Sequence, residues 1–387
     1  MNKLEQAKAF EAVYEQLNDQ QKIAVDTIEG PVMVIAGPGT GKTQILGARI
    51  GKILLETDTA PENILCLTYT DAGAIAMRKR LVSFIGTSAY KVNIATFHSF
   101  CNDIIQDNLS LFDKTSLDPI SELEKIELLK KLIDGFEKNN SLKRYRGDVY
   151  YEMGNLAKLF SAMKKEGWTP QYLLEKVDDY IKEIPFRDEF IYKRKYKQFE
   201  AGSLKQGLVD AELEKMEKLK AAINCFDIYQ QLMKDRNRYD FEDMINWVIN
   251  AFKINKNLLA QYQERFLYIL VDEFQDTSGT QNELVQLLVN YWDQPNLFVV
   301  GDDDQSIFRF QGANVENMLH FQQDYAQEVL MIVLENNYRS TQPILDASTI
   351  IINNNQERLV NKIEGLEKKL ISSHPDLQKD TTLPTIV

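Results

Sequence analysis

The chain has 387 residues, of which 44% are hydrophobic and 26% are charged, so its composition is globular and it is long enough for two or three cores. No apolar run reaches the roughly 18 residues of a membrane span, and residues 1–17 carry charges where a signal peptide would be apolar. We therefore expect a cytoplasmic protein without a membrane partner.

The three cysteines, Cys66, Cys101 and Cys225, are odd in number and far apart, which indicates neither a disulfide framework nor a metal site. The formal net charge is -12, and most of the excess acidity follows residue 240. A nucleic-acid-binding surface would therefore have to be local. The basic stretches that suit such a surface, or a solvated helix face, are residues 141–147, 163–168 and 192–199.

Residues 1–110 alternate strand-like runs such as VMVIA (32–36) with helix-like runs such as AIAMRKRLVSFI (74–85). This alternation predicts an α/β fold, a parallel sheet with helices on both faces. Residues 111–240 instead space their apolar residues by three and four, which predicts helix throughout. The alternation then resumes. We predict one α/β domain, residues 1–110 plus 240–335, interrupted by an all-α subdomain at 111–239.

The last part of the chain changes again. A helix-like run at 342–355 is followed by a polar stretch and then by LPTIV (383–387), which resembles the start of a strand. We expect residues 336–387 to begin a second domain and the chain to be part of a longer protein.

The stretch AGPGTGKT (36–43) joins an apolar strand to a helix. Glycines let backbone amides turn toward an anion at the start of a helix, Lys42 can reach the β and γ phosphates, and Thr43 offers a hydroxyl to Mg²⁺. An ordinary glycine-rich turn is the alternative. The predicted nucleotide-binding residues of this loop are Gly37, Gly39, Thr40, Gly41, Lys42 and Thr43.

Two further strands end in carboxylates. The run LYILVDEFQDT (267–277) places Asp272 and Glu273 at a strand end, where we assign Asp272 to a metal and Glu273 to the catalytic base; an acidic helix cap is the alternative. After LFVVGDDD (297–304), Phe308 and Phe310 suit either stacking against nucleic-acid bases or packing in the core.

Several motifs occur together in a fixed order: LNDQQ (17–21), AGPGTGKT, LTYTDAGAIAM (67–77), ATFHSF (95–100), YDFEDMI (239–245), VDEFQDT (271–277), GDDDQSIFRFQGA (301–313) and LENNYRST (334–341). In this order and spacing the chain resembles the amino-terminal half of the superfamily 1 DNA helicases of the UvrD, Rep and PcrA type. The resemblance covers residues 15–110 and 240–350 closely.

The resemblance implies a RecA-like P-loop NTPase that uses ATP and Mg²⁺ to move along single-stranded DNA, or a duplex with a single-stranded tail, in the 3′ to 5′ direction. It implies that Gln21 reads adenine, Tyr338 stacks on it, Gln305 senses the γ phosphate, and Arg339 is an arginine finger beside the catalytic Lys42 and Glu273. A remaining carboxyl-terminal motor domain would be its partner. The implied DNA-binding residues are Tyr69, Thr70, Thr96, His98, Phe241, Phe308 and Phe310.

The chain departs from the family pattern at some motif positions. Gln44 follows the loop where Arg is frequent, Asp71 and Ala72 replace Asn and Lys, and Gln311 replaces an Arg. These changes remove positive charge near the expected DNA path, so weaker DNA affinity is expected. Two other functions stay open from the sequence: the helicase half of a helicase-nuclease, and a non-catalytic nucleic-acid-binding module. A small-molecule kinase is less well supported, because no acceptor lid is evident.

Overall fold

The structure is a computed structural model that describes residues 3–112, 118–137, 140–144, 146–197, 199–305 and 315–383. The chain folds into two compact units, one formed by residues 1–108 and 247–387 and the other by residues 109–246. The assignment of these units as a motor domain and an inserted subdomain, with a further boundary near residue 335, stays a prediction. Within the described ranges, no helix combines the length and apolarity needed to cross a membrane.

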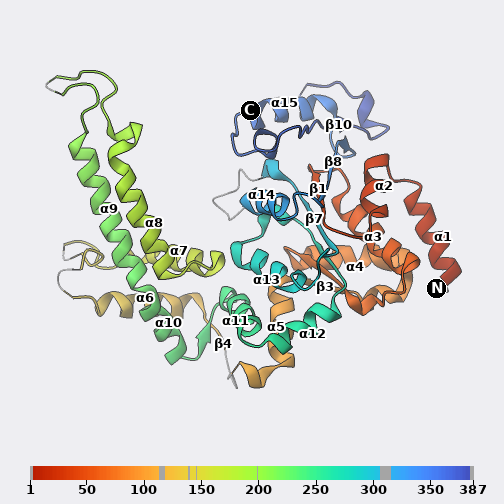
Figure 1. The fold of residues 1–387 in the computed structure, drawn as a ribbon, viewed down its shortest axis with the longest axis horizontal. Coiled ribbons are helices and arrows are strands. Elements are labelled where there is room, and N and C mark those ends of the chain that lie inside the picture. The colour runs from red at the N-terminus through yellow and green to blue at the C-terminus, as the bar shows by residue number, and fades with distance from the viewer. Residues whose placement is uncertain are drawn as a thin grey trace. The chain divides into compact units, whose positions relative to one another are not determined.

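The first unit is built on a parallel six-stranded sheet, which confirms the predicted α/β class (Figure 1). Most of its strands are short runs buried along their whole length, the pattern of a sheet covered on both faces. In sheet order the strands are β3 (Asn93–Thr96), β2 (Ile64–Thr68), β6 (Tyr268–Val271), β7 (Leu297–Gly301), β1 (Val32–Ala36) and β8 (Leu330–Leu334).

Helices cover both faces of this sheet. Val32, Val34 and Ala36 share one core with residues of α1 to α4, because alternate side chains of a strand point to the same face. Figure 1 draws α13 and α14 on the other side of the sheet from α2 and α3. The helices of this unit are α1 (Lys3–Tyr14), α2 (Asp19–Asp26), α3 (Lys42–Glu56), α4 (Asp71–Ile85), α5 (Phe97–Asp107), α12 (Lys256–Arg265), α13 (Gly279–Val289), α14 (Val315–Asp324) and α15 (Gln342–Ile352).

The strand order decides which loops meet. Strand β1 lies between β7 and β8, and β6 is the next strand beyond β7. Because all of these strands are parallel, their carboxyl ends lie at one edge of the sheet. The glycine-rich loop after β1 therefore meets the carboxylates that follow β6 and β7, and the asparagine pair of β9 (Asn336–Asn337), which comes directly after β8 and pairs with β10 (Ile371–Ser372).

The second unit is mainly helical, as predicted for this part of the chain. Its core joins apolar residues of five helices, and α8 and α9 lie side by side (Figure 1). The helices are α6 (Glu122–Asp134), α7 (Met153–Glu166), α8 (Pro170–Glu183), α9 (Gln206–Asn224) and α10 (Phe226–Asp235), and α11 (Phe241–Ile254) begins in this unit.

The prediction of helix throughout residues 111–240 was wrong at the ends of this range and in the described residues that join α6 to α7 and α8 to α9. A two-residue parallel pair joins β4 (Asp118–Pro119) to β5 (Arg238–Tyr239), where the chain enters and leaves the unit side by side. Between α8 and α9, the described residues of 187–205, all but residue 198, contain no α-helix. In this segment Gly202 has a φ of +89°, which ends helical geometry, and the Tyr192 ring stacks on Phe199 at 5.0 Å across the reversed chain.

Candidate functional site

The loop after β1 has a shape that only glycine permits at two positions. Gly39 and Gly41 have φ values of +78° and +92°. A Cβ atom on Gly41 would lie 2.7 Å from Nε2 of Gln21, and one on Gly39 would lie 2.5 Å from Cβ of Arg339. The Thr40 hydroxyl donates to the Gly37 carbonyl at 2.7 Å, which closes the loop on itself. The loop therefore carries its amides into the start of α3, where the helix dipole favours an anion.

Lys42 begins α3, and its Nζ atom donates to Oε2 of Glu273 at 2.5 Å. Glu273 itself has a φ of +49°, a backbone conformation that residues other than glycine rarely adopt. The same Oε2 accepts a 2.9 Å hydrogen bond from Nε2 of the buried Gln275. Strain of this kind clusters at functional sites, and here it aims the glutamate toward the glycine-rich loop.

Asp272 lies next to Glu273 and is buried. The pKa of its carboxyl is raised to about 6, first by burial and then by the neighbouring Glu273 charge, against the opposing effect of Lys42. Such a carboxylate is stabilised by a cation, and Thr43 offers a hydroxyl from the first turn of α3. Oxygen donors of these two kinds fit Mg²⁺, so the residues present suit the predicted metal.

Gln21 and Tyr338 are both bonded to the same neighbour. Asn18 caps α2 by accepting from the Gln21 amide at 2.9 Å, and its side chain donates to the Tyr338 hydroxyl at 2.9 Å. Gln21 also donates to the Thr40 carbonyl at 2.9 Å. The two residues that the resemblance assigns to adenine are thus brought together beside the glycine-rich loop.

The segment after β8 is bonded directly to the loop after β1. The buried Asn337 side chain donates to the Pro38 carbonyl at 2.6 Å and accepts from the backbone amides of Arg339 and Ser340. The Tyr338 amide donates to the Gly39 carbonyl at 2.9 Å. The backbone of Arg339 is therefore fixed at the loop, whereas its side chain is exposed.

Gln305 is held near the same edge. Its side chain donates to Oδ2 of Asp302 at 3.0 Å, and the Asp302 amide donates to the Gln275 side chain at 2.8 Å. Our sequence reasoning did not single out the bridging residues Asn18, Gln275 and Asn337. The signal that could have indicated them is that each is an uncharged polar residue in the same motif as a predicted site residue.

The predicted DNA-binding residues of the first unit follow β2 and β3, which are neighbours in the sheet. The hydroxyls of Thr70 and Thr96 cap α4 and α5 by accepting from backbone amides, at 3.0 Å and 3.2 Å. Tyr69 is 45% exposed, and His98 lies in the first turn of α5. A cavity of about 560 Å³ opens beside them, with Asp71, Arg78, Lys79, Thr96, Ser99 and Asp103 among the residues that line it.

The remaining predicted DNA-binding residues do not belong to the described part of the first unit. Phe308 and Phe310 fall outside the described residues, as does Gln311. Phe241 belongs to the helical unit, begins α11 and is 59% exposed.

Phe241 is flanked by a buried ion-pair cluster. Lys164 of α7 is buried, and its Nζ atom lies 2.7 Å from Asp240 and 2.9 Å from Asp243. Burial raises the pKa of the Asp243 carboxyl to about 6; Lys164 opposes this shift, and the Asp240 charge adds to it. These two bonds fix the backbone on either side of Phe241, which leaves its ring at the surface.

The glycine-rich loop, the lysine at the start of α3 and the acidic pair after β6 define a P-loop nucleotide-binding site on a parallel sheet. Residues 17–326 match the UvrD/REP helicase N-terminal domain, and the chain belongs to this family, whose fold is RecA-like.

Curated relatives include two staphylococcal proteins named ATP-dependent DNA helicase PcrA. The protein from Staphylococcus aureus strain Mu50 is 32% identical over 351 residues, and that from Staphylococcus epidermidis strain RP62A is 33% identical over 351 residues. Each alignment covers 90% of this chain but 41% of the relative. The chain therefore spans about two fifths of the length of these relatives.

Proposed function

We propose that this chain is the ATP-binding part of an ATP-dependent DNA helicase or translocase that moves on single-stranded DNA. The observation that carries the proposal is the contact between Lys42 and Glu273, because it joins the phosphate-binding lysine to the catalytic carboxylate at one point. Family membership and the helicase relatives support the same conclusion.

In this mechanism the amides of the glycine-rich loop and Lys42 bind the phosphates, while Gln21 and Tyr338 hold the base. Glu273 takes a proton from the attacking water, and Lys42, which is bonded to Oε2 of Glu273 in this structure, turns to the phosphates when ATP binds. Asp272 and Thr43 would hold Mg²⁺, which would neutralise charge on the β and γ phosphates. Gln305 would sense the γ phosphate, and Arg339 would stabilise charge that develops in the transition state.

For DNA, the exposed Tyr69 and the capped starts of α4 and α5 are the proposed contacts of the first unit, with Phe241 contributing from the helical unit. Phe308 and Phe310 remain proposed stacking residues. The cavity beside Thr96 has room for a base. Because the Asp71 carboxylate lines that cavity at a position where the resemblance implies Asn, we expect a weakened DNA affinity.

The relatives are more than twice as long as the aligned part. We propose that a second motor domain faces the nucleotide, so that closure of the two domains on ATP produces movement. The 387-residue chain by itself should then bind Mg-ATP weakly and hydrolyse it slowly. The 3′ to 5′ direction rests on the resemblance alone, and unwinding of duplexes with a 3′ or a 5′ tail would determine it.

The proposal is tested by ATP hydrolysis with and without oligo(dT) in the full-length protein that contains this chain. We expect DNA to stimulate hydrolysis, and Lys42→Ala to abolish it. The matched control is Lys52→Ala, which removes another lysine of α3 that pairs with Asp26 and Glu56. Hydrolysis that neither responds to DNA nor depends on Lys42 would contradict the proposal, and DNA binding without any hydrolysis would favour a non-catalytic binding module.

A further inference from the structure

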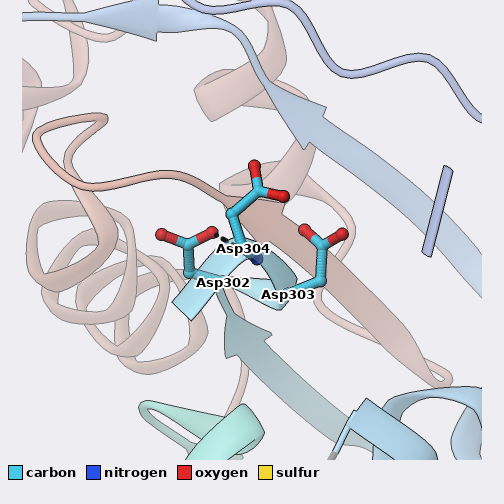
Figure 2. A group of neighbouring side chains, drawn as sticks. All are labelled: Asp302, Asp303 and Asp304. Atoms are coloured by element: carbon cyan, nitrogen blue, oxygen red, sulfur yellow. Dashed lines mark hydrogen bonds between the residues drawn. The ribbon is translucent and has the colours of Figure 1, made fainter. Parts of the chain in front are cut away.

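Three consecutive aspartates, Asp302, Asp303 and Asp304, follow β7 with their carboxylates side by side (Figure 2). The first two side chains are fully buried, and the third is 20% exposed. Burying three carboxylates without compensation is strongly unfavourable, so their charge must be balanced inside the fold.

The balancing charge comes from the carboxyl-terminal segment. The ammonium group of Lys368 lies 2.8 Å from Asp302, 2.6 Å from Asp303 and 2.9 Å from Asp304, and its side chain is 1% exposed. Burial alone would lower the pKa of this lysine, but the three carboxylates outweigh burial and raise it. Lys368 therefore stays charged and occupies the position that a bound cation would take in such a cluster.

The other carboxylate oxygens are bonded as well. The Arg358 guanidinium makes a two-pronged contact with Asp304, at 2.6 Å and 3.2 Å, and the Leu359 amide donates to Oδ2 of Asp303 at 2.9 Å. With Gln305 on Oδ2 of Asp302, all six carboxylate oxygens accept a hydrogen bond. These ion pairs and hydrogen bonds thus join the end of β7 to residues 358–368, and they satisfy the aspartates without a metal.

A chain of hydrogen bonds links this cluster to Glu273, the proposed catalytic base. Lys368 binds Asp302, the Asp302 amide donates to Oε1 of Gln275, and Nε2 of Gln275 donates to Oε2 of Glu273. The other oxygen of Asp302 accepts from Gln305 at 3.0 Å. One aspartate therefore connects the buried lysine to both residues that the proposed mechanism uses at the γ phosphate.

Two residues further on, the same segment reaches the glycine-rich loop. A Cβ atom on Gly37 would lie 2.9 Å from Cδ1 of Leu370, and the following strand β10 pairs with β9, whose Asn337 binds the loop. Residues 368–372 therefore contact both sides of the nucleotide site, the acidic side through Lys368 and the loop side through Leu370.

We propose that Lys368 is a positioning residue for ATP hydrolysis, which acts through Asp302 and Gln275 to hold Glu273 and Gln305 in place. This inference rests on the proposed function. In the described part of the chain, the hydrogen bonds and ion pairs of Lys368 go to Asp302, Asp303 and Asp304, and none of these is predicted to bind ATP. The loss of Lys368 should therefore reduce turnover and leave nucleotide affinity unchanged. A movement of the segment around residue 368 would then be transmitted directly to the hydrolytic residues.

Three variants of the full-length protein test the proposal: Lys368→Met, the double variant Lys368→Met with Asp303→Asn, and the control Lys362→Met. The double variant removes one buried negative charge along with the lysine, which keeps the fold close to charge balance. Lys362 lies on the same segment and pairs with Glu357 away from the cluster. For each protein we would measure thermal stability, the dissociation constant of a fluorescent ATP analogue, and kcat.

We expect kcat to fall about ten- to a hundredfold in both Lys368 variants, as for small misplacements of catalytic groups, with analogue affinity within about twofold of the parent protein. Lys362→Met should match the parent. A stable Lys368→Met with parental kcat would overturn the proposal. So would a double variant that recovers both stability and kcat, because Lys368 would then only balance charge.

A second readout separates this inference from the proposed function. Hydrogen-deuterium exchange of residues 271–277 and 301–305 should be at least about tenfold faster in Lys368→Met than in the parent, because the bond from the Asp302 amide to Gln275 loosens. Unchanged exchange there would overturn the inference. If the parent protein hydrolysed no ATP but this exchange still responded, the proposed function would fail while the connection from Lys368 to Gln275 stood.

Discussion

The side chain of Asn337 donates a 2.6 Å hydrogen bond to the carbonyl of Pro38, 299 residues earlier in the chain. This bond exists because β8 and β1 are parallel neighbours, so the segment after one strand lies against the loop after the other. The segment that holds the phosphate-binding loop therefore also carries Tyr338, proposed to stack on adenine, and Arg339, the proposed arginine finger.

Asn337→Ala should therefore lower both stability and ATP affinity. The variant leaves the Pro38 carbonyl and two backbone amides without their buried partner, which costs about 1 to 3 kcal/mol in the free energy of unfolding. Urea denaturation and titration with a fluorescent ATP analogue measure the two effects. Asn336→Ala, in the adjacent and less buried position, is the control, and equal effects of both variants would contradict this role of Asn337.

Glu273→Gln should separate binding from hydrolysis. The amide keeps the size of the side chain but cannot accept a proton, so turnover should fall about 10²- to 10⁴-fold while ATP still binds. Single-turnover hydrolysis of radiolabelled ATP and equilibrium binding provide the comparison. Retention of parental turnover would exclude Glu273 as the base.

Tyr338→Ala should weaken binding of ATP through loss of stacking, by about 5- to 160-fold if stacking contributes about 1 to 3 kcal/mol. Tyr338→Phe keeps the ring and loses only the bond to Asn18, so it should bind nearly as well as the parent chain. Isothermal titration of each variant with Mg-ATP and with Mg-triphosphate tests this. If the alanine variant lost triphosphate affinity equally, Tyr338 would not be acting on the base.

The helical unit should show a pH dependence from Asp243. Its carboxyl has a pKa of about 6 in the fold and an ordinary value of 3.8, so the folded state binds the proton more tightly. The stabilisation from protonation is fully present below about pH 4 and is lost as the pH rises through about 6, with an upper bound of about 3 kcal/mol.

Urea denaturation at pH 4.5 and at pH 7.5 measures this effect. In Asp243→Asn the part of the pH dependence due to this carboxyl should disappear, whereas the control Asp235→Asn, at an exposed position of α10, should behave as the parent. If Asp243→Asn kept the full parental pH dependence, another group would be responsible.

Local patterns were sufficient to predict the sheet and the two motifs that meet at one edge of it. Strands β1 and β6 are unbroken apolar runs. Lys42 follows β1 after the glycine-rich loop, and Glu273 follows directly after the Asp that ends the β6 run. The contact between them could be expected, because both strands are parallel and end at one edge.

Other features have no local signal. Lys368 is one of two adjacent lysines in a polar stretch, and its three partners, Asp302 to Asp304, lie more than sixty residues earlier, so no periodicity indicates that it is buried. Residues 187–205 were wrongly predicted as helix: Phe190 packs in a small core with Ile184 and Val209, and the Tyr192 and Phe199 rings stack on each other across the reversed chain. Tertiary contacts decide both cases.

The central claim is that the glycine-rich loop and the acidic pair bind one magnesium-bound triphosphate. A crystal structure of the chain with a non-hydrolysable ATP analogue and Mn²⁺, located by anomalous scattering, tests it most directly. We predict a single ion at the Thr43 hydroxyl and the Asp272 carboxylate, with Lys42 released from Glu273 onto the phosphates. An ion bound away from Asp272, or a triphosphate outside the loop, would contradict the claim.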